Sequence, residues 1–141
     1  STARILYNEP YRAVPMRHDF ASLRDDGVPA CVSYSWKAGP GWTTIECAPS
    51  GPARVATPDS QEAFITEHYW GYTRQRDGGT VEYRVDHPPW RVWSVEAPEI
   101  VGDLEQTYGP MFASILRRSP ASAFLADGSP VMVFAPARLD Q

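Results

Sequence analysis

The sequence predicts a β-rich α+β domain: an antiparallel, partly closed, barrel-like sheet, with one main helix at about residues 60–69 packed on it and a short helix near residues 103–108. Fourteen prolines and ten glycines indicate many short elements joined by tight turns. Seven tyrosines, five phenylalanines and five tryptophans favour strands over helices. With 141 residues, 43% of them hydrophobic, the chain fits a single domain, residues 1–141, with a core of ordinary size.

The first part of the chain predicts an antiparallel meander. Tyr11 to Phe20 is typical of an extended segment, and a turn follows at Asp25-Asp26-Gly27. Ala30 to Trp36 alternates β-favouring residues with small ones, which predicts a strand. Gly39-Pro40-Gly41 ends that strand, and Trp42 to Cys47 is expected to return beside it.

The main helix is predicted from its capping residues. Residues 48–58 are rich in proline and are expected to form a loop. Asp59 or Ser60 then opens the helix, and Glu62 stands three residues after Asp59 in a capping-box arrangement. One helix face carries Ile65, Tyr69 and Tyr72, so the helix is expected to pack over the sheet.

A hairpin follows the helix. Trp70 to Arg76 is expected to be extended, and Asp77-Gly78-Gly79 is a strong hairpin signal. The next strand alternates strictly. Its apolar face carries Val81, Tyr83 and Val85, and its wet or site-lining face carries Glu82, Arg84 and Asp86.

The last elements are shorter. Val92 to Val95 predicts a strand, and Asp103 to Tyr108 predicts the short helix. Residues 123–125 and 131–134 are apolar and flank Asp127-Gly128-Ser129. They therefore predict a final hairpin that is buried on both faces.

Charge and hydropathy exclude several classes of partner. The net charge of −4 and the pI near 5.3 argue against a nucleic-acid partner, which would need a basic face. No run of about 18 apolar residues exists, so the sequence predicts no membrane span. No apolar signal region follows Ser1 to Arg4. These features together predict a cytoplasmic protein.

The two cysteines, Cys31 and Cys47, flank Gly39-Pro40-Gly41 at nearly equal distance. If that tripeptide turns a hairpin, the two thiols lie close to one another across it. They then form a disulfide, or they stay reduced and buried as small hydrophobic side chains. Their spacing matches no metal motif.

Three blocks of sequence resemble one known family. They are residues 3–16, which include Pro10-Tyr11; residues 64–73, followed by His87-Pro88-Pro89-Trp90; and a closing apolar hairpin that ends at residues 136–139. This order resembles the YqjF-like family (DUF2071), a widespread group of bacterial proteins of unknown function. Because members of that family are usually longer, the resemblance implies the carboxy-terminal part of a larger protein. It also implies a homodimer or a missing amino-terminal half.

The YqjF-like family in turn resembles acetoacetate decarboxylase, a β-rich, barrel-like enzyme that forms a Schiff base through a lysine. Tyr11 and Arg12 stand at the matching positions here, and neither side chain can form an imine. Lys37, the only lysine, falls on a different predicted strand. The resemblance therefore implies the fold without that mechanism and without a cofactor.

Each histidine stands beside an acid, at His18-Asp19, Glu67-His68 and Asp86-His87. Three histidines with carboxylates could form a zinc or iron site. Neighbouring residues on a strand point to opposite faces, however, and the spacings match no metal motif. We therefore expect no metal.

His87 and Glu67 are the candidate catalytic residues. The prolines after His87 would hold its imidazole in a fixed direction, so it either faces a site with Trp90 as an apolar wall or bonds a backbone carbonyl at a structural corner. Glu67 either pairs with an arginine, from Arg12, Arg74 or Arg84, or acts unpaired as a general base.

Three functional classes follow. The first is a binding module that holds a small anionic or apolar molecule in the concavity of the sheet. Its predicted ligand-binding residues are Tyr11, Arg12, Tyr72, Arg84, His87 and Trp90. The second is an enzyme of unassigned reaction that uses Glu67 or His87 for proton transfer. The third is a subunit that completes another half-barrel and binds no ligand.

Overall fold

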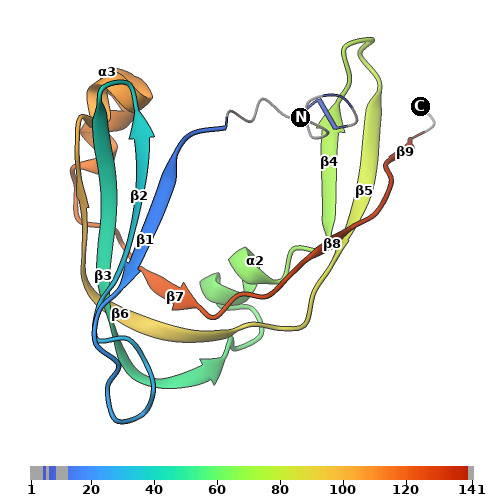
Figure 1. Cartoon of the computed structure of the whole chain (residues 1–141). Helices are drawn as coiled ribbons and strands as arrows, with labels where there is room; N and C mark the ends of the chain where they lie inside the picture. The colour runs from blue at the N-terminus through green and yellow to red at the C-terminus, as the bar shows by residue number, and fades with distance from the viewer. Residues whose placement is uncertain (1–4, 6, 9–12, 140–141) are drawn as a thin grey trace. The chain divides into compact units, whose positions relative to one another are not determined.

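The computed structural model describes residues 5, 7–8 and 13–139 (Figure 1). The chain divides into two compact units. Unit 1 contains Val55–Arg91, the segment from Ala126 onward and the described residues before Val14, and unit 2 contains Val14–Arg54 and Val92–Leu125. The coarse prediction is confirmed, because the described chain consists of two antiparallel sheets and two helices.

Unit 2 is built on a five-stranded sheet with the order β1-β2-β3-β6-β7. Its strands are β1 (Met16–Phe20), β2 (Val32–Ala38), β3 (Gly41–Val55), β6 (Arg91–Val101) and β7 (Phe124–Ala126). The predicted meander is confirmed. Met16 lies opposite Trp36 between β1 and β2, and Ala38 lies opposite Gly41 across the turn between β2 and β3.

β3 is longer than the sequence predicts. It continues to Val55, so the loop expected at residues 48–58 is wrong for residues 48–55. Proline lacks only the backbone donor, so a carbonyl inside this segment can still be paired. The Pro49 carbonyl accepts a hydrogen bond from the Arg24 guanidinium at 2.8 Å. Gly51 adopts a φ of 67°, the left-handed conformation that glycine provides where a strand departs from regular pleating.

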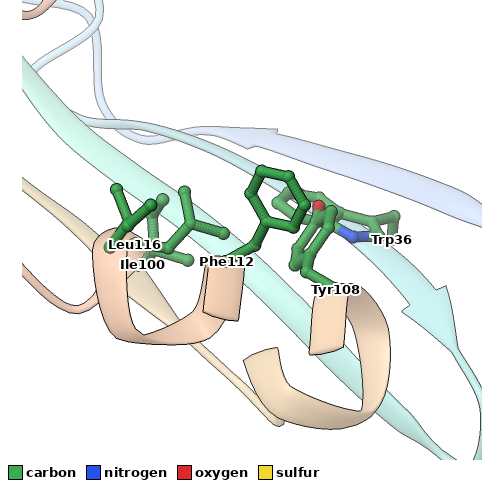
Figure 2. A pocket seen from close by; sticks show the side chains of 6 residues that line it. Trp36, Ile100, Tyr108, Phe112 and Leu116 are labelled. Atoms are coloured by element: carbon green, nitrogen blue, oxygen red, sulfur yellow. The ribbon is translucent and has the colours of Figure 1, made fainter. Parts of the chain in front are cut away.

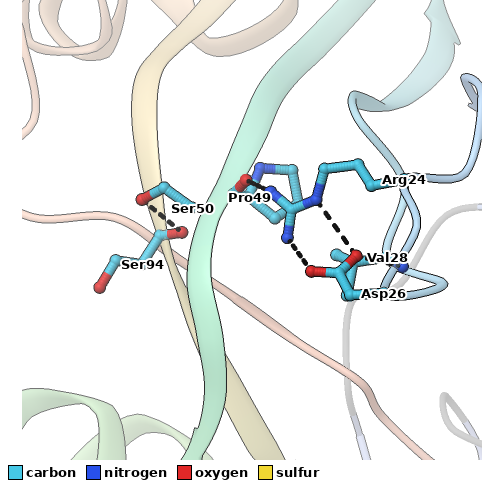
Figure 3. Close-up of polar contacts among 6 residues, drawn as sticks. All are labelled: Arg24, Asp26, Val28, Pro49, Ser50 and Ser94. Carbon is cyan, nitrogen blue, oxygen red and sulfur yellow. Dashed lines mark hydrogen bonds and ion pairs between the residues drawn. The ribbon is translucent and has the colours of Figure 1, made fainter.

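The predicted turn at Asp25-Asp26-Gly27 is confirmed, and Arg24 ties it to β3 (Figure 3). Arg24 and Asp26 form an ion pair at 2.9 Å, and Asp26 also accepts the Val28 amide. These interactions hold the pKa of Asp26 below its ordinary value of 3.8, with the Arg24 hydrogen bond as the main cause.

α3 (Leu104–Leu116) lies in unit 2 and begins at the predicted Asp103, whose side chain accepts the Gln106 amide at 3.0 Å. The first helical segment ends at Tyr108 as predicted, but the sequence did not predict the second segment that follows it. Gly109 takes a φ of 79° and kinks the helix, and Pro110 starts its second segment, where a missing N–H costs nothing. Leu104 and Ala113 are the buried residues of α3.

The core of unit 2 consists of apolar side chains from β2, β6 and α3. The buried hydrophobic residues are Val32, Val92, Trp93, Leu104 and Ala113. The hydroxyl-bearing residues Ser35 and Thr43 are buried beside them, and Ser35 shares a hydrogen bond with the Thr44 hydroxyl at 2.8 Å. Among the described residues of unit 2, Ser35 and Thr43 are the polar residues buried with this core.

Unit 1 contains a smaller antiparallel sheet, in the order β4-β5-β8 with β9 also paired to β5. Its strands are β4 (Trp70–Arg74), β5 (Thr80–Asp86), β8 (Met132–Val133) and β9 (Ala137–Arg138). The predicted hairpin is confirmed, since Arg74 lies opposite Thr80 and Gly78 takes a φ of 89° in the turn. Arg84 and Asp86 are exposed while Val85 between them is half-buried, as the alternation predicts.

The main helix is shorter than predicted. α2 (Gln61–Thr66) has six residues and is capped by Ser60, which accepts the Ala63 amide at 3.1 Å. The capping box from Asp59 is wrong, because Asp59 lies outside the helix with a φ of 63°. The expected packing face is also wrong: Phe64 is 73% and Ile65 50% exposed. Strand pairing of β4 overrides helix formation beyond Glu67.

The final hairpin is wrong as well. β7 pairs with β6 in one sheet, while β8 pairs with β5 in the other. The Asp127 carboxylate accepts the Arg91 amide and pairs with the Arg91 guanidinium at 3.0 Å, so long-range contacts replace a tight turn. Val131, Met132 and Val133 are exposed rather than buried.

Neither sheet closes on itself within the described residues, so the partly closed barrel is not confirmed. No described helix has the length and apolar composition needed to cross a membrane.

Candidate functional site

An apolar pocket lies between α3 and the sheet of unit 2 (Figure 2). Its volume is about 290 Å³. β2 contributes Trp36, β6 contributes Ile100, and α3 contributes the rest of the wall. The α3 residues are Tyr108, Phe112, Ile115 and Leu116.

The kink in α3 lies in the middle of this wall. Tyr108 precedes Gly109 and Pro110, whereas Phe112 and Leu116 follow them on the second segment. Phe112 and Leu116 are four residues apart, so they lie on one side of that segment. Trp36 comes from the strand face that also carries Tyr34 and buried Val32.

The wall of the pocket remains partly open to solvent. Phe112 is 55% and Ile115 53% exposed, although both are large and apolar. The Tyr108 hydroxyl and the Trp36 indole N–H, both visible in Figure 2, have no hydrogen-bond partner within the described part of the chain. The pocket therefore combines apolar walls with two polar groups that are available to a ligand.

A second hollow of about 670 Å³ adjoins the first, because Ile100, Ile115 and Leu116 line both. Arg117, Arg118 and Glu99 also line this hollow. Two guanidinium groups and one carboxylate give it a net charge of about +1 at neutral pH. Apolar and cationic surfaces thus lie next to each other at the C-terminal end of α3.

The sequence prediction concentrated on unit 1, where three predicted site residues, Glu67, His87 and Trp90, come together around Tyr69, which the sequence did not single out as a site residue. The His87 and Trp90 rings stack at 4.2 Å, and the Tyr69 ring lies 4.9 Å from His87. Trp90 is fixed by a 2.8 Å hydrogen bond from its indole N–H to the Ser129 hydroxyl. Glu67 joins the group through Tyr69, whose hydroxyl donates a hydrogen bond to the carboxylate.

The His87 tautomer follows from its backbone contact. Nδ1 lies 2.9 Å from the Pro88 carbonyl oxygen, which can only accept a hydrogen bond. Nδ1 therefore carries the proton, and Nε2 of the neutral ring has a free lone pair. The expectation of a bond to a backbone carbonyl is confirmed. An open hollow of about 470 Å³, which Pro130 and Met132 also line, adjoins this ring.

Of the three arginines expected to pair with Glu67, the structure describes Arg74 and Arg84, and neither pairs with it. Among the described residues its carboxylate accepts hydrogen bonds from Tyr69 and Thr66, and the pairing with Arg74 or Arg84 is wrong. The Arg84 guanidinium instead lies 4.0 Å over the Phe134 ring. The Glu67 carboxylate, together with burial, raises the pKa of Tyr69 to about 12, so the phenol stays neutral.

Of the remaining predicted ligand-binding residues, the two that the structure describes, Tyr72 and Arg84, do not join this cluster. Tyr11 and Arg12 lie outside the described residues. Tyr72 lies opposite Glu82, and Arg84 lies opposite Trp70, on the outward face of the β4–β5 hairpin. In the described part of the chain no ring contact, hydrogen bond or ion pair connects Tyr72 or Arg84 to His87.

The cysteines are free thiols and are half-buried rather than buried. Cys47 lies opposite Val32, so Cys31 is one residue away from direct pairing across the hairpin. Burial is the main cause that raises the pKa of both thiols, and Glu46 adds to it. Within the described residues no cluster of three or more His, Cys, Asp or Glu could hold a metal ion.

Comparison with known proteins gives one match. The model of the family DUF2071, described as an uncharacterized conserved protein, matches residues 1–135. The family resemblance drawn from the sequence is thereby confirmed, but the acetoacetate decarboxylase-like fold is not. No curated protein and no solved structure matches the chain.

Proposed function

The chain belongs to the DUF2071 family, and we propose that it binds a small amphipathic carboxylate in the pocket between α3 and the sheet of unit 2. The apolar body of the ligand lies against Trp36 and Phe112, and its carboxylate lies toward Arg117 and Arg118. The ligand class is therefore a fatty or aromatic acid of modest size.

The pocket next to a cationic hollow is the observation that carries this proposal. Phe112 and Ile115 are exposed apolar side chains, and a ligand that covers them removes apolar area from water. This burial favours binding by roughly 25 cal/mol per Å² of apolar area. Arginine binds carboxylates with planar, charge-assisted hydrogen bonds. The volume of about 290 Å³ suits a ligand at the small end of the usual range.

Tryptophan fluorescence tests the proposal, because Trp36 lines the pocket. We expect saturable quenching or a spectral shift with decanoate or naphthoate, and weaker binding of the matching alcohols. Phe112→Ala should weaken binding by about ten- to a hundredfold through lost apolar contact. Phe64→Ala is the matched control, because it removes an exposed phenylalanine from unit 1.

Two outcomes would contradict the proposal. One is the absence of saturable binding by any of these acids to the folded protein. The other is binding that Phe112→Ala leaves unchanged. The paired charge reversals Arg117→Glu and Arg118→Glu sharpen the test, since they should remove the preference for the acid over the alcohol while leaving the alcohol bound.

A second function, proton transfer by His87, is favoured by its fixed tautomer. Nε2 presents a lone pair beside an open hollow, and Tyr69 stands between His87 and Glu67. Deuterium incorporation into a panel of small ketones, followed by proton NMR, tests this role. His87→Gln should abolish the incorporation and His68→Gln should not. Equal rates in both variants would exclude His87 as the base.

The finer expectations from the sequence stay predictions. They are the partly closed barrel, the acetoacetate decarboxylase-like fold, a cytoplasmic location and a single domain within a longer protein. The role of a subunit without its own ligand is the outcome that a failed binding experiment would favour.

A further inference from the structure

β1 is an edge strand with an unusual amount of exposed apolar surface. It lies at one end of the strand order in the unit 2 sheet (Figure 1), and all five of its residues are exposed. Met16 is 66% and Phe20 48% exposed. An exposed edge strand with apolar side chains favours pairing with another strand.

The hydrogen bonds to β2 show which backbone groups of β1 point outward. The Pro15 carbonyl accepts from the Lys37 amide at 2.9 Å, and the Ala21 amide donates to the Cys31 carbonyl at 3.0 Å. Inward and outward groups alternate along an antiparallel strand, so Arg17 and Asp19 also point their backbone groups toward β2. Met16, His18 and Phe20 therefore point theirs to the open edge.

The side chains of β1 are self-complementary about His18. Arg17 and Asp19 lie on one face, one residue to either side of the centre, and Met16 and Phe20 lie on the other face. The Arg17 guanidinium is held 4.2 Å over the Trp42 ring on its own face of the sheet. The opposite face is aromatic, with the His18 and Phe20 rings 5.0 Å apart.

We propose that two copies of this chain dimerise through β1, pairing antiparallel about a two-fold axis at His18. This register puts Arg17 opposite Asp19 of the second copy twice, and Met16 opposite Phe20 twice. Met16, His18 and Phe20 supply the backbone hydrogen bonds, so the side chains of Arg17 and Asp19 meet at the closer, non-hydrogen-bonded pairs. The two sheets become one continuous sheet, with the same patch used by both copies.

The charges select this register over its neighbours. An axis at Arg17 would place two arginines opposite each other, and an axis at Asp19 would place two aspartates opposite each other. Like charges directly opposite on adjacent strands are destabilising. The His18-centred register also pairs every residue of β1, whereas either shifted register leaves part of the strand unpaired.

Sedimentation velocity over a concentration series tests the proposal. The wild-type chain of 15.7 kDa should be a concentration-dependent dimer. R17D and D19R should each weaken the dimer by on the order of tenfold or more, because both cross-strand pairs turn from attractive to repulsive. R76D is the matched control: it makes the same charge change at an exposed arginine of unit 1, outside β1 and outside the proposed ligand pocket, and should leave the dimer unchanged.

Mixing gives the decisive result. R17D carries two acids on β1 and D19R carries two arginines, so an equimolar mixture should form a heterodimer about as tight as the wild type. The charge-swapped variant R17D/D19R should form a homodimer again. Because Arg17 stacks on Trp42, R17D could disturb the fold. The double variant makes the same substitution, so its recovery would separate misfolding from repulsion.

Three results would overturn the proposal. A wild-type chain that stays monomeric over the whole series means that β1 does not pair with itself, whatever else covers it. A dimer that tolerates R17D and D19R equally well uses another surface. A mixture of the two folded variants that yields no heterodimer excludes the His18-centred register.

Discussion

The two compact units differ in what stabilises them. Every buried hydrophobic side chain of the described chain belongs to unit 2, in β2, β6 and α3. In unit 1 the buried positions among the described residues are Thr66 and Gly79. Unit 2 therefore depends on apolar burial, which is non-directional and proportional to area.

Unit 1 depends on directional contacts instead. The Tyr7 ring meets Tyr83 edge-on at 4.7 Å, and the Tyr7 hydroxyl donates to the Phe134 carbonyl at 3.0 Å. Thr73 donates to the Tyr7 carbonyl at 2.7 Å, and Arg138 pairs with Asp77. Such contacts depend on geometry and on charge. This difference predicts how the stability of each unit changes. Unit 2 should be destabilised most by substitutions that leave a cavity, and unit 1 by substitutions that disturb its contact geometry and by changes of pH.

The largest effect should come from a cavity in unit 2. Leu104 is 2% exposed, so Leu104→Ala removes buried methyl groups and leaves a void, which costs about 3 kcal/mol of unfolding free energy. Urea denaturation followed by tryptophan fluorescence measures it. Leu23→Ala, an exposed leucine in the same unit, should change stability by less than about 0.5 kcal/mol. Equal effects would mean that α3 adds little to this core.

An intermediate effect is expected from added volume in unit 1. A Cβ at Gly71 would collide with the Tyr83 ring on the neighbouring strand. Gly71→Ala should therefore cost about 1–3 kcal/mol, as overpacking does, and shift the NMR signals of Tyr7 and Tyr83. Gly41→Ala is the control, because a Cβ there meets nothing within 4 Å. A variant as stable as wild type would show that Tyr83 moves freely.

Local signals in the sequence predicted some elements correctly. The turn at Gly78, the alternation of β5 and the start of a helix at Asp103 each depend on a few neighbouring residues. The errors arose where distant pairing decides. β4 takes the segment after Glu67 out of the predicted helix, and β7 and β8 pair with strands far along the chain instead of with each other. Tertiary contacts overrode local preference there.

The contacts around the candidate sites could be predicted from the sequence only in part. His87 and Trp90 are adjacent in sequence to the prolines that orient them, so their contact could be expected. The pocket in unit 2 was missed because Gly109 and Pro110 predict the end of a helix after Tyr108. A signal was present: Phe112, Ile115 and Leu116 have the spacing of one helix face. Their meeting with Trp36 could not be read from spacing, since it depends on the sheet.

A smaller effect should follow from acid in unit 1. The Arg138 hydrogen bond, with help from the Gly79 amide, lowers the pKa of Asp77 below its ordinary value of 3.8. A carboxyl with a lowered folded pKa stabilises the fold above its unfolded pKa, and this contribution is lost as pH falls through the folded value. The stability difference between wild type and Asp77→Asn should therefore shrink at acid pH. A stability difference that stays constant as the pH falls through the range where carboxyl groups titrate would contradict a contribution from the charged Asp77.

The smallest effect on stability, and the sharpest local readout, concerns Tyr69. Its pKa is raised from 10.0 to about 12 because its hydroxyl donates to Glu67. A raised folded pKa means that this bond contributes fully below the unfolded value and is lost as pH rises from about 10 to 12. The difference in phenolate absorbance between wild type and Tyr69→Phe isolates this residue. Glu67→Gln should bring the titration of Tyr69 back toward 10, since the acceptor keeps its place and loses its charge.

Near-ultraviolet circular dichroism over the same pH range checks that unit 1 is still folded. A Tyr69 that titrates normally in the folded wild type would mean that the contact with Glu67 does not persist in solution. Glu67 would then be available to act with His87, and unit 1 would carry a candidate active site in addition to the directional contacts that stabilise it.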